Sequence, residues 1–101
     1  MFIIEETEIF SEWLENLSDH LAVIHIVKRI ERAKLGNFGD HKSVGDGIFE
    51  MRITQGKGYR LYYARKGDIT YLLICGGDKS TQQSDIEKAK SIWHEIKMGD
   101  K

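Results

Sequence analysis

The feature that most constrains the fold is an alternation of apolar and polar residues between positions 48 and 64, interrupted by a glycine-rich turn. A period of two is typical of β-strands, because successive side chains point to opposite faces of a sheet. The turn over residues 55–58 contains two glycines, so its flanks predict an antiparallel hairpin with strands at 48–54 and 58–65. A third strand, apolar on both faces and therefore interior, is expected near 69–75.

One register of this hairpin gathers apolar side chains on a single face. Its directly opposed pairs are Ile53 with Tyr59, Met51 with Leu61, and Phe49 with Tyr63. Because opposed residues share a face, this register also places Arg52 opposite Arg60 on the other face, beside Glu50. Two like charges in direct opposition are unfavourable. Two explanations stay open, namely an ion pair between Glu50 and Arg60, or an anion such as phosphate that both arginines grip.

Apolar residues at helical spacing flank the strands on both sides. A first helix is expected after the N-cap Thr7 and a second from about Asp19 to Leu35. A last helix begins near Ser80, where Ser80 and Gln83 fit a capping box. The residues 2–4 form a short apolar run and predict an edge strand, while a further short strand is possible near 41–44. The fold class is therefore α+β, with two N-terminal helices packed on an antiparallel sheet of about four strands and a C-terminal helix.

The composition predicts one cytoplasmic domain over residues 1–101. Hydrophobic residues make up 41% of the chain, which suffices for one core without metals or disulfides. Cys75 is the only cysteine and is expected to be a buried thiol. The N-terminus does not read as a signal peptide, and no apolar run approaches the roughly 20 residues that span a bilayer. The four histidines lack metal-ligand spacing, so we expect neither a metal nor a cofactor.

The charges are segregated although the net charge is only −1. Residues 1–27 contain six acids and no Lys or Arg, whereas residues 28–66 contain ten bases and four acids. Residues 67–101 are nearly balanced. This distribution predicts a basic face suited to a polyanion, with RNA as the expected partner, although ordinary solvated charge is the alternative.

Five short segments in this order and spacing resemble a known family. They are Gly36-Asn37-Phe38-Gly39-Asp40, Val44-Gly45-Asp46-Gly47, Phe49-Glu50-Met51-Arg52, Gly58-Tyr59-Arg60-Leu61-Tyr62-Tyr63 and Gly76-Gly77-Asp78-Lys79-Ser80. Over nearly the whole chain they look like addiction-module killer proteins, in the HigB and phage Gp49-like branch of the RelE/ParE toxin superfamily. The resemblance implies a RelE-like fold, which agrees with the elements predicted above.

The resemblance also implies an activity and partners. RelE- and HigB-type toxins cut mRNA in the ribosomal A site and are held inactive by an antitoxin from the adjacent gene, often a helix-turn-helix protein. The implied function is therefore a type II toxin that cleaves mRNA on the ribosome through the 2′-hydroxyl, without metal and away from membranes. Two alternatives stay open: a ParE-like poison of DNA gyrase without catalysis, and a non-catalytic RNA-binding relic.

The candidate site residues come from this resemblance and from chemistry. Arg60 matches the sheet arginine that RelE-like nucleases place at the scissile phosphate, Arg52 matches a common superfamily arginine, and Lys79 falls near a basic position after the last strand. The chain departs from RelE, because Glu50 stands where RelE has paired lysines and no catalytic tyrosine is evident near the C-terminus. His94 is a possible substitute for that tyrosine.

Chemistry adds further candidates. Histidine is the side chain most often used as a general base, so His41 is a candidate for that role. A helix N-terminus after Gly76-Gly77-Asp78 is a possible anion site, and Tyr62 is the tyrosine expected to stack on a base. The expected RNA-binding residues are Lys42, Lys57, Tyr62, Arg65 and Lys66.

Overall fold

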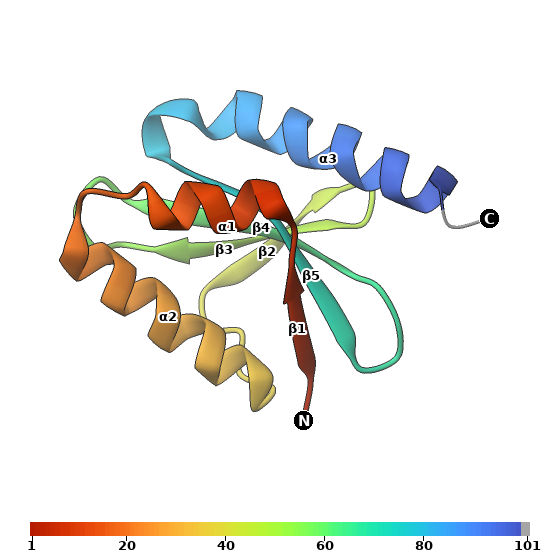
Figure 1. Cartoon of the computed structure of the whole chain (residues 1–101), viewed down its shortest axis with the longest axis horizontal. Coiled ribbons are helices and arrows are strands. Elements are labelled where there is room, and N and C mark those ends of the chain that lie inside the picture. Colours follow the sequence, from red (N-terminus) through yellow and green to blue (C-terminus); the bar gives the residue numbers. More distant parts are fainter. Residues whose placement is uncertain (100–101) are drawn as a thin grey trace.

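The computed structural model describes residues 1–99, which form a five-stranded sheet with helices on both faces (Figure 1). In chain order the elements are β1 (Ile3–Glu6), α1 (Glu8–Glu15), α2 (His20–Lys34), β2 (His41–Gly45), β3 (Ile48–Ile53), β4 (Tyr59–Arg65), β5 (Thr70–Asp78), a 3₁₀ turn (Lys79–Thr81) and α3 (Gln82–Gly99). The α+β class and the C-terminal helix are confirmed. None of the helices in this described part is long and apolar enough to cross a membrane.

The sheet has one strand more than the four expected, and its order is β1-β5-β4-β3-β2. The additional strand is β2, which pairs with β3 through a two-residue turn at Asp46 and Gly47. Both turn residues have positive φ, 54° and 82°, and this conformation suits the right-handed twist of a tight hairpin. β1 lies at an edge as predicted, but it runs parallel to β5, so the sheet is mixed. The interior position of β5 is confirmed.

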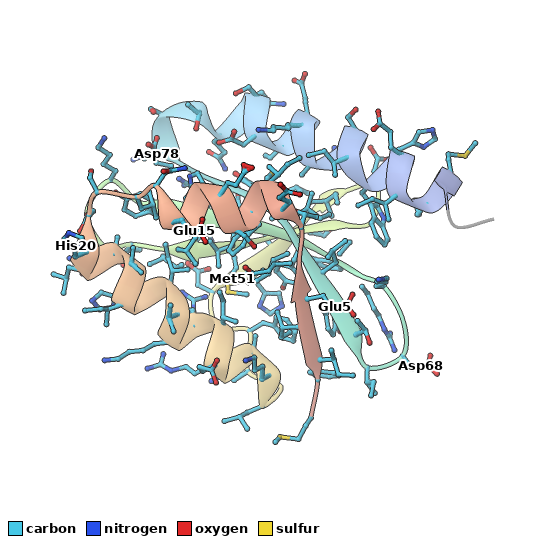
Figure 2. The ribbon with its side chains drawn as sticks, in the orientation of Figure 1. Glu5, Glu15, His20, Met51, Asp68 and Asp78 are labelled. Atoms are coloured by element: carbon cyan, nitrogen blue, oxygen red, sulfur yellow. The ribbon has the colours of Figure 1, made fainter. Side chains whose placement is uncertain are left out.

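The predicted register of the central hairpin is confirmed. Ile53 lies opposite Tyr59, and Arg52 lies opposite Arg60, with no bulge between β3 and β4. The apolar face of the hairpin packs against α1 and α2, and Met51 lies between the sheet and these helices in Figure 2. The principal buried residues of this layer are Phe10, Ala22, Ile26, Ile30, Met51, Leu61, Tyr63 and Leu73.

The opposite face of the sheet carries α3 and a second core. The predicted apolar stripe of the last helix is confirmed, since Ala89 and Trp93 are buried against the sheet and Ile86 and Ile96 pack beside them. Cys75 is buried in this layer, and burial, together with the nearby Asp85, raises the pKa of its thiol to about 12. This layer covers the Ile48 end of the hairpin, while Arg52 and Arg60 lie beyond it.

β5 continues through Gly76 and Gly77, beyond the predicted end of the third strand near residue 75. A Cβ at Gly76 would lie 2.4 Å from the ring of Trp13 on α1, and a Cβ at Gly77 would lie 1.8 Å from the carboxylate of Asp85 on α3. The glycine pair therefore lets a helix approach the strand closely from each side.

Replacing Gly76 with alanine is expected to lower the free energy of unfolding by about 1–3 kcal/mol, because the new methyl group would overpack a filled core. Urea unfolding followed by circular dichroism measures the loss. Gly67→Ala is the matched control, since a Cβ there would lie 4.0 Å from its nearest neighbour, the Cβ of Thr70. Equal unfolding midpoints for the two variants would contradict the packing explanation.

The helix caps were predicted in part. Thr7 accepts a hydrogen bond from the amide of Phe10, so this predicted N-cap is confirmed. Asp19, expected only as the approximate start of the second helix, caps α2 by accepting a hydrogen bond from the amide of Ala22. The capping box at Ser80 is wrong, because Asp78 caps the 3₁₀ turn instead and accepts from the Ser80 amide. The hydrogen bonds that Asp78 accepts from the hydroxyl and the amide of Ser80 lower the pKa of the Asp78 carboxyl. The expected anion site at this helix start is therefore already occupied by an acid of the chain.

Candidate functional site

A basic cleft of about 480 Å³ opens at the end of the β3–β4 hairpin. Four of the residues that line it carry positive charge, namely Arg52, Lys57, Arg60 and Lys79, and Asp40 is the acid among them. The register of the hairpin places the two arginines side by side, the turn places Lys57 at the rim, and the end of β5 brings in Lys79. Four cations against one carboxylate make the cleft suitable for an anion.

Arg60 is held from behind by a buried acid. Glu50 is fully buried, and its Oε2 lies 3.5 Å from Nε of Arg60, whose side chain is 13% exposed. The same oxygen accepts hydrogen bonds from the hydroxyl of Tyr62 at 3.1 Å and from Nε2 of Gln82 at 2.9 Å. Nη1 of Arg60 donates to the carbonyl of Gly58. The guanidinium is thus fixed along one edge, while its Nη2 forms no hydrogen bond within the described chain.

This geometry confirms one of the two explanations for the opposed arginines, since Glu50 forms the ion pair with Arg60. Arg52 has a different partner, because its Nη2 lies 3.0 Å from Oδ1 of Asp40 and its side chain is 39% exposed. Each arginine therefore has its own acid, and each keeps part of its guanidinium directed to the cleft. Three buried polar atoms of the described residues lack a hydrogen-bond partner, and all belong here: Glu50 Oε1, Arg52 Nε and Arg60 Nε.

The two lysines complete the cleft. Lys57 lies in the turn and Lys79 follows β5, and a Cβ on Gly58 would lie only 3.7 Å from that of Lys79. Neither ammonium group forms an ion pair with another described residue, in contrast to both arginines. The structure therefore brings together four of the sequence-predicted residues from three separate segments.

The two candidate histidines lie elsewhere. His41 of β2 lies opposite Met51 of β3, so it is on the face of the sheet that α1 and α2 cover. Its ring centroid lies 6.0 Å from that of Phe38. His94 lines a separate cavity beside Trp93 and Lys97 on α3. Sequence analysis did not predict the register of β2 or the direction of α3, and both determine these positions.

The remaining predicted RNA-binding residues also lie outside the cleft. Tyr62 shares the arginine face as expected, but α3 buries it completely, so it does not offer its ring to a base in this structure. Burial, followed by the nearby Glu50, raises the pKa of its phenol. Lys42 is exposed on β2 and does not line the cleft.

Arg65 and Lys66 lie at the far end of β4. Arg65 donates to the carbonyls of Gly67 and Asp68, and Lys66 pairs with Glu5 at 2.9 Å. Figure 2 shows Asp68 at the opposite end of the molecule from Asp78, the residue before Lys79. These two bases therefore belong to a different surface from the cleft.

The residues that sequence analysis missed are Asp40 and Arg29. Arg29 donates to the carbonyls of Phe38, Asp40 and Arg52, so it ties the loop before β2 to the end of β3. Gly39 permits this approach, since it has a φ of 62° and a Cβ there would lie 2.8 Å from Nη2 of Arg29. The glycines of this loop were the available signal, but nothing local indicated which side chain they would contact.

The described residues contain no group of three or more His, Cys, Asp or Glu side chains arranged to hold a metal ion. The charged groups that line the cleft are two guanidinium groups, two ammonium groups and one carboxylate. Such a set binds and neutralises phosphate oxygens.

Comparison with known proteins agrees with the resemblance at the level of the family. Residues 12–94 match the model of the family described as phage derived protein Gp49-like. An uncharacterised protein of Haemophilus influenzae is 48% identical over 93 residues, which cover 92% of this chain and 94% of that protein. With most of its length matched in this way, the chain belongs to the phage-derived Gp49-like protein family.

Proposed function

We propose that this protein is the toxin of a type II toxin–antitoxin module and that it cleaves mRNA on the ribosome. The observation that carries the proposal is the guanidinium of Arg60, fixed from behind by Glu50 and open to a cleft that also holds Arg52, Lys57 and Lys79. The buried Nε atoms of both arginines form no hydrogen bond and support it as well, because a buried polar group without a hydrogen bond needs an explanation, such as a bound ligand.

The chemistry needs a proton acceptor, cations at the phosphate and a proton donor. In the proposed reaction the 2′ oxygen attacks phosphorus, the bond to the 5′ oxygen breaks, and Arg60 and Arg52 stabilise the charge on the phosphate oxygens. Asp40 lies in the cleft and accepts the 2′ proton, while the Lys79 ammonium donates a proton to the leaving 5′ oxygen. The products are a 2′,3′-cyclic phosphate and a free 5′-hydroxyl.

The positions of His41 and His94 favour Asp40 as the acceptor, since neither histidine lines the cleft. The same positions are also compatible with the alternative of a gyrase poison. A cleft that is not lined by a histidine has fewer groups for proton transfer. The implied partners are the ribosome, mRNA and an antitoxin encoded by the adjacent gene.

The proposal is tested by inducing the chain in bacterial cells and mapping the 5′ ends of a reporter mRNA by primer extension. We expect growth arrest with new 5′ ends inside the coding region, and both effects should disappear when the adjacent gene is co-expressed. A reporter with its start codon removed is the control, since an mRNA that is not translated should stay intact. Intact reporter mRNA together with double-strand DNA breaks and an SOS response would replace the nuclease by a gyrase poison.

A further inference from the structure

A second basic groove adjoins the cleft on the side of α2. It has a volume of about 300 Å³ and shares Arg52, Asp40, Ile53 and Thr54 with the cleft, so the two meet at the end of β3. Its other wall comes from α2, which contributes Lys28, Arg29, Arg32 and His25. The hollow surface therefore continues from Lys79 across Arg52 to the basic side of this helix.

The three Lys and Arg residues that α2 contributes to the groove differ in the contacts that hold them. Arg29 is a structural member of the wall, because its guanidinium donates to backbone carbonyls on both sides of the groove. Burial lowers the pKa of Arg29, and the positive charge of Arg32 lowers it further, while Asp40 opposes this shift. Arg29 thus positions the groove and has few donors left for a ligand.

Lys28 and Arg32 have no such structural role. Both are exposed, they lie one helical turn apart, and neither forms a hydrogen bond or an ion pair with another described residue. Like charges at this spacing repel each other on a helix. Lys34, on the same helix, is paired with Glu31 instead, at 2.9 Å. Glu31 is the single acid of α2, and it forms no ion pair with either of the two cations at the groove.

The two grooves together are lined by seven bases and one acid: Lys28, Arg29, Arg32, Arg52, Lys57, Arg60 and Lys79, with Asp40. Glu50, buried behind Arg60, offsets one further positive charge. A single phosphate would occupy only one of the two volumes. A continuous positive track of this kind instead suits a chain of phosphates, such as the backbone of a single strand. The charge excess along the track favours a nucleic acid over the apolar or mixed surface of a protein partner.

Resting on the proposed function, we propose that an RNA strand bound in the cleft continues over Arg52 into the α2 groove, where Lys28 and Arg32 each contact a backbone phosphate. These contacts hold the strand without reading its sequence, because phosphates carry no base information. They extend the binding site beyond the reacting phosphate and help to keep the strand in place there.

The test uses fluorescence anisotropy with two labelled 2′-O-methyl oligouridines, a 12-mer and a 3-mer, which cannot be cleaved. The double variant Lys28→Ala/Arg32→Ala is expected to bind the 12-mer about 25-fold more weakly at 0.1 M salt, and its salt slope should fall by about 1.4, at about 0.7 per phosphate contact in single strands. The 3-mer has only two phosphates, so a 3-mer held at Arg60 and Arg52 should not depend on Lys28 and Arg32, and its affinity should stay unchanged. Circular dichroism verifies that each variant is folded.

The control is Lys88→Ala/Lys97→Ala, which removes two charges from α3, a helix that contributes no residue to either groove. It should keep the wild-type slope. If Lys28→Ala/Arg32→Ala behaves like this control while Arg60→Lys weakens both probes, the α2 groove is not part of the site and the proposed function stands. If Arg60→Lys also binds both probes normally, or the wild type does not bind the 12-mer at 0.05 M salt, the inference and its basis both fail.

Discussion

Replacing Arg60 with lysine is expected to abolish growth arrest and to lower the rate of mRNA cleavage on purified ribosomes by about 100- to 1000-fold, the usual loss when one oxyanion donor is removed. Lysine keeps a positive charge beside Glu50, but it replaces the planar guanidinium fork with one ammonium group. The Nη2 group that is open to the cleft therefore disappears while the buried acid still has a cation nearby. Single-turnover cleavage measured by primer extension gives the rate.

The matched control is Arg65→Ala on the same strand. Arg65 lies at the other end of β4 and donates to carbonyls of its own turn, so its loss should leave cleavage within about twofold of the wild type. Arg60→Ala is a weaker test, because it would leave Glu50 buried without its cation and could act by unfolding. Growth arrest by a folded Arg60→Lys protein at wild-type expression would remove Arg60 from the reaction.

The central hairpin could be predicted from the sequence because its determinants are local. The alternation of apolar residues along β3 and β4 permits one register with a uniform apolar face, and a shift by one residue would mix the two faces. The position of Arg52 opposite Arg60 follows from that register alone. The cleft residues Lys57 and Lys79 then lie near the pair because one is in the hairpin turn and the other follows the neighbouring strand.

Which part of the arginine face is covered by a helix could not be predicted in the same way. Tyr62 lies on that face, as the alternation indicates, yet it is buried because α3 crosses the Ile48 end of the sheet. Which face a helix covers depends on chain connections and on close approaches such as that of Gly77 to Asp85. Alternation assigns a residue to a face but does not reveal whether solvent reaches it.

The second groove shows the same limit at longer range. The basic side of α2 was visible as a polar stripe that contains Lys28 and Arg32. Its place beside Arg52 depends on Arg29, which reaches the carbonyls of a loop nine to eleven residues away and of β3. Such contacts join segments that are distant in sequence, and the residue pattern of either segment alone does not predict them.

Replacing Glu50 with alanine is expected to lower the free energy of unfolding by about 3–5 kcal/mol, because breaking a buried ion pair leaves its other member without compensation. Arg60, the Tyr62 hydroxyl and Gln82 all contact the same carboxylate oxygen of Glu50, so all three groups lose a partner. Urea unfolding gives the value. Asp40→Ala is the control, since it breaks the ion pair of Arg52 at the surface, where such pairs contribute about 0–1 kcal/mol.

A second variant separates the charge from the cavity that alanine leaves. In Glu50→Met/Arg60→Met both charges are gone and most of the volume is retained, so stability should recover relative to Glu50→Ala, as it does when apolar residues replace a whole buried pair. A double variant that is as unstable as Glu50→Ala would show that shape, and not charge, is responsible. If the double variant folds well, the fold does not require the charged pair, and the loss of mRNA cleavage expected of this folded variant is due to the missing guanidinium of Arg60.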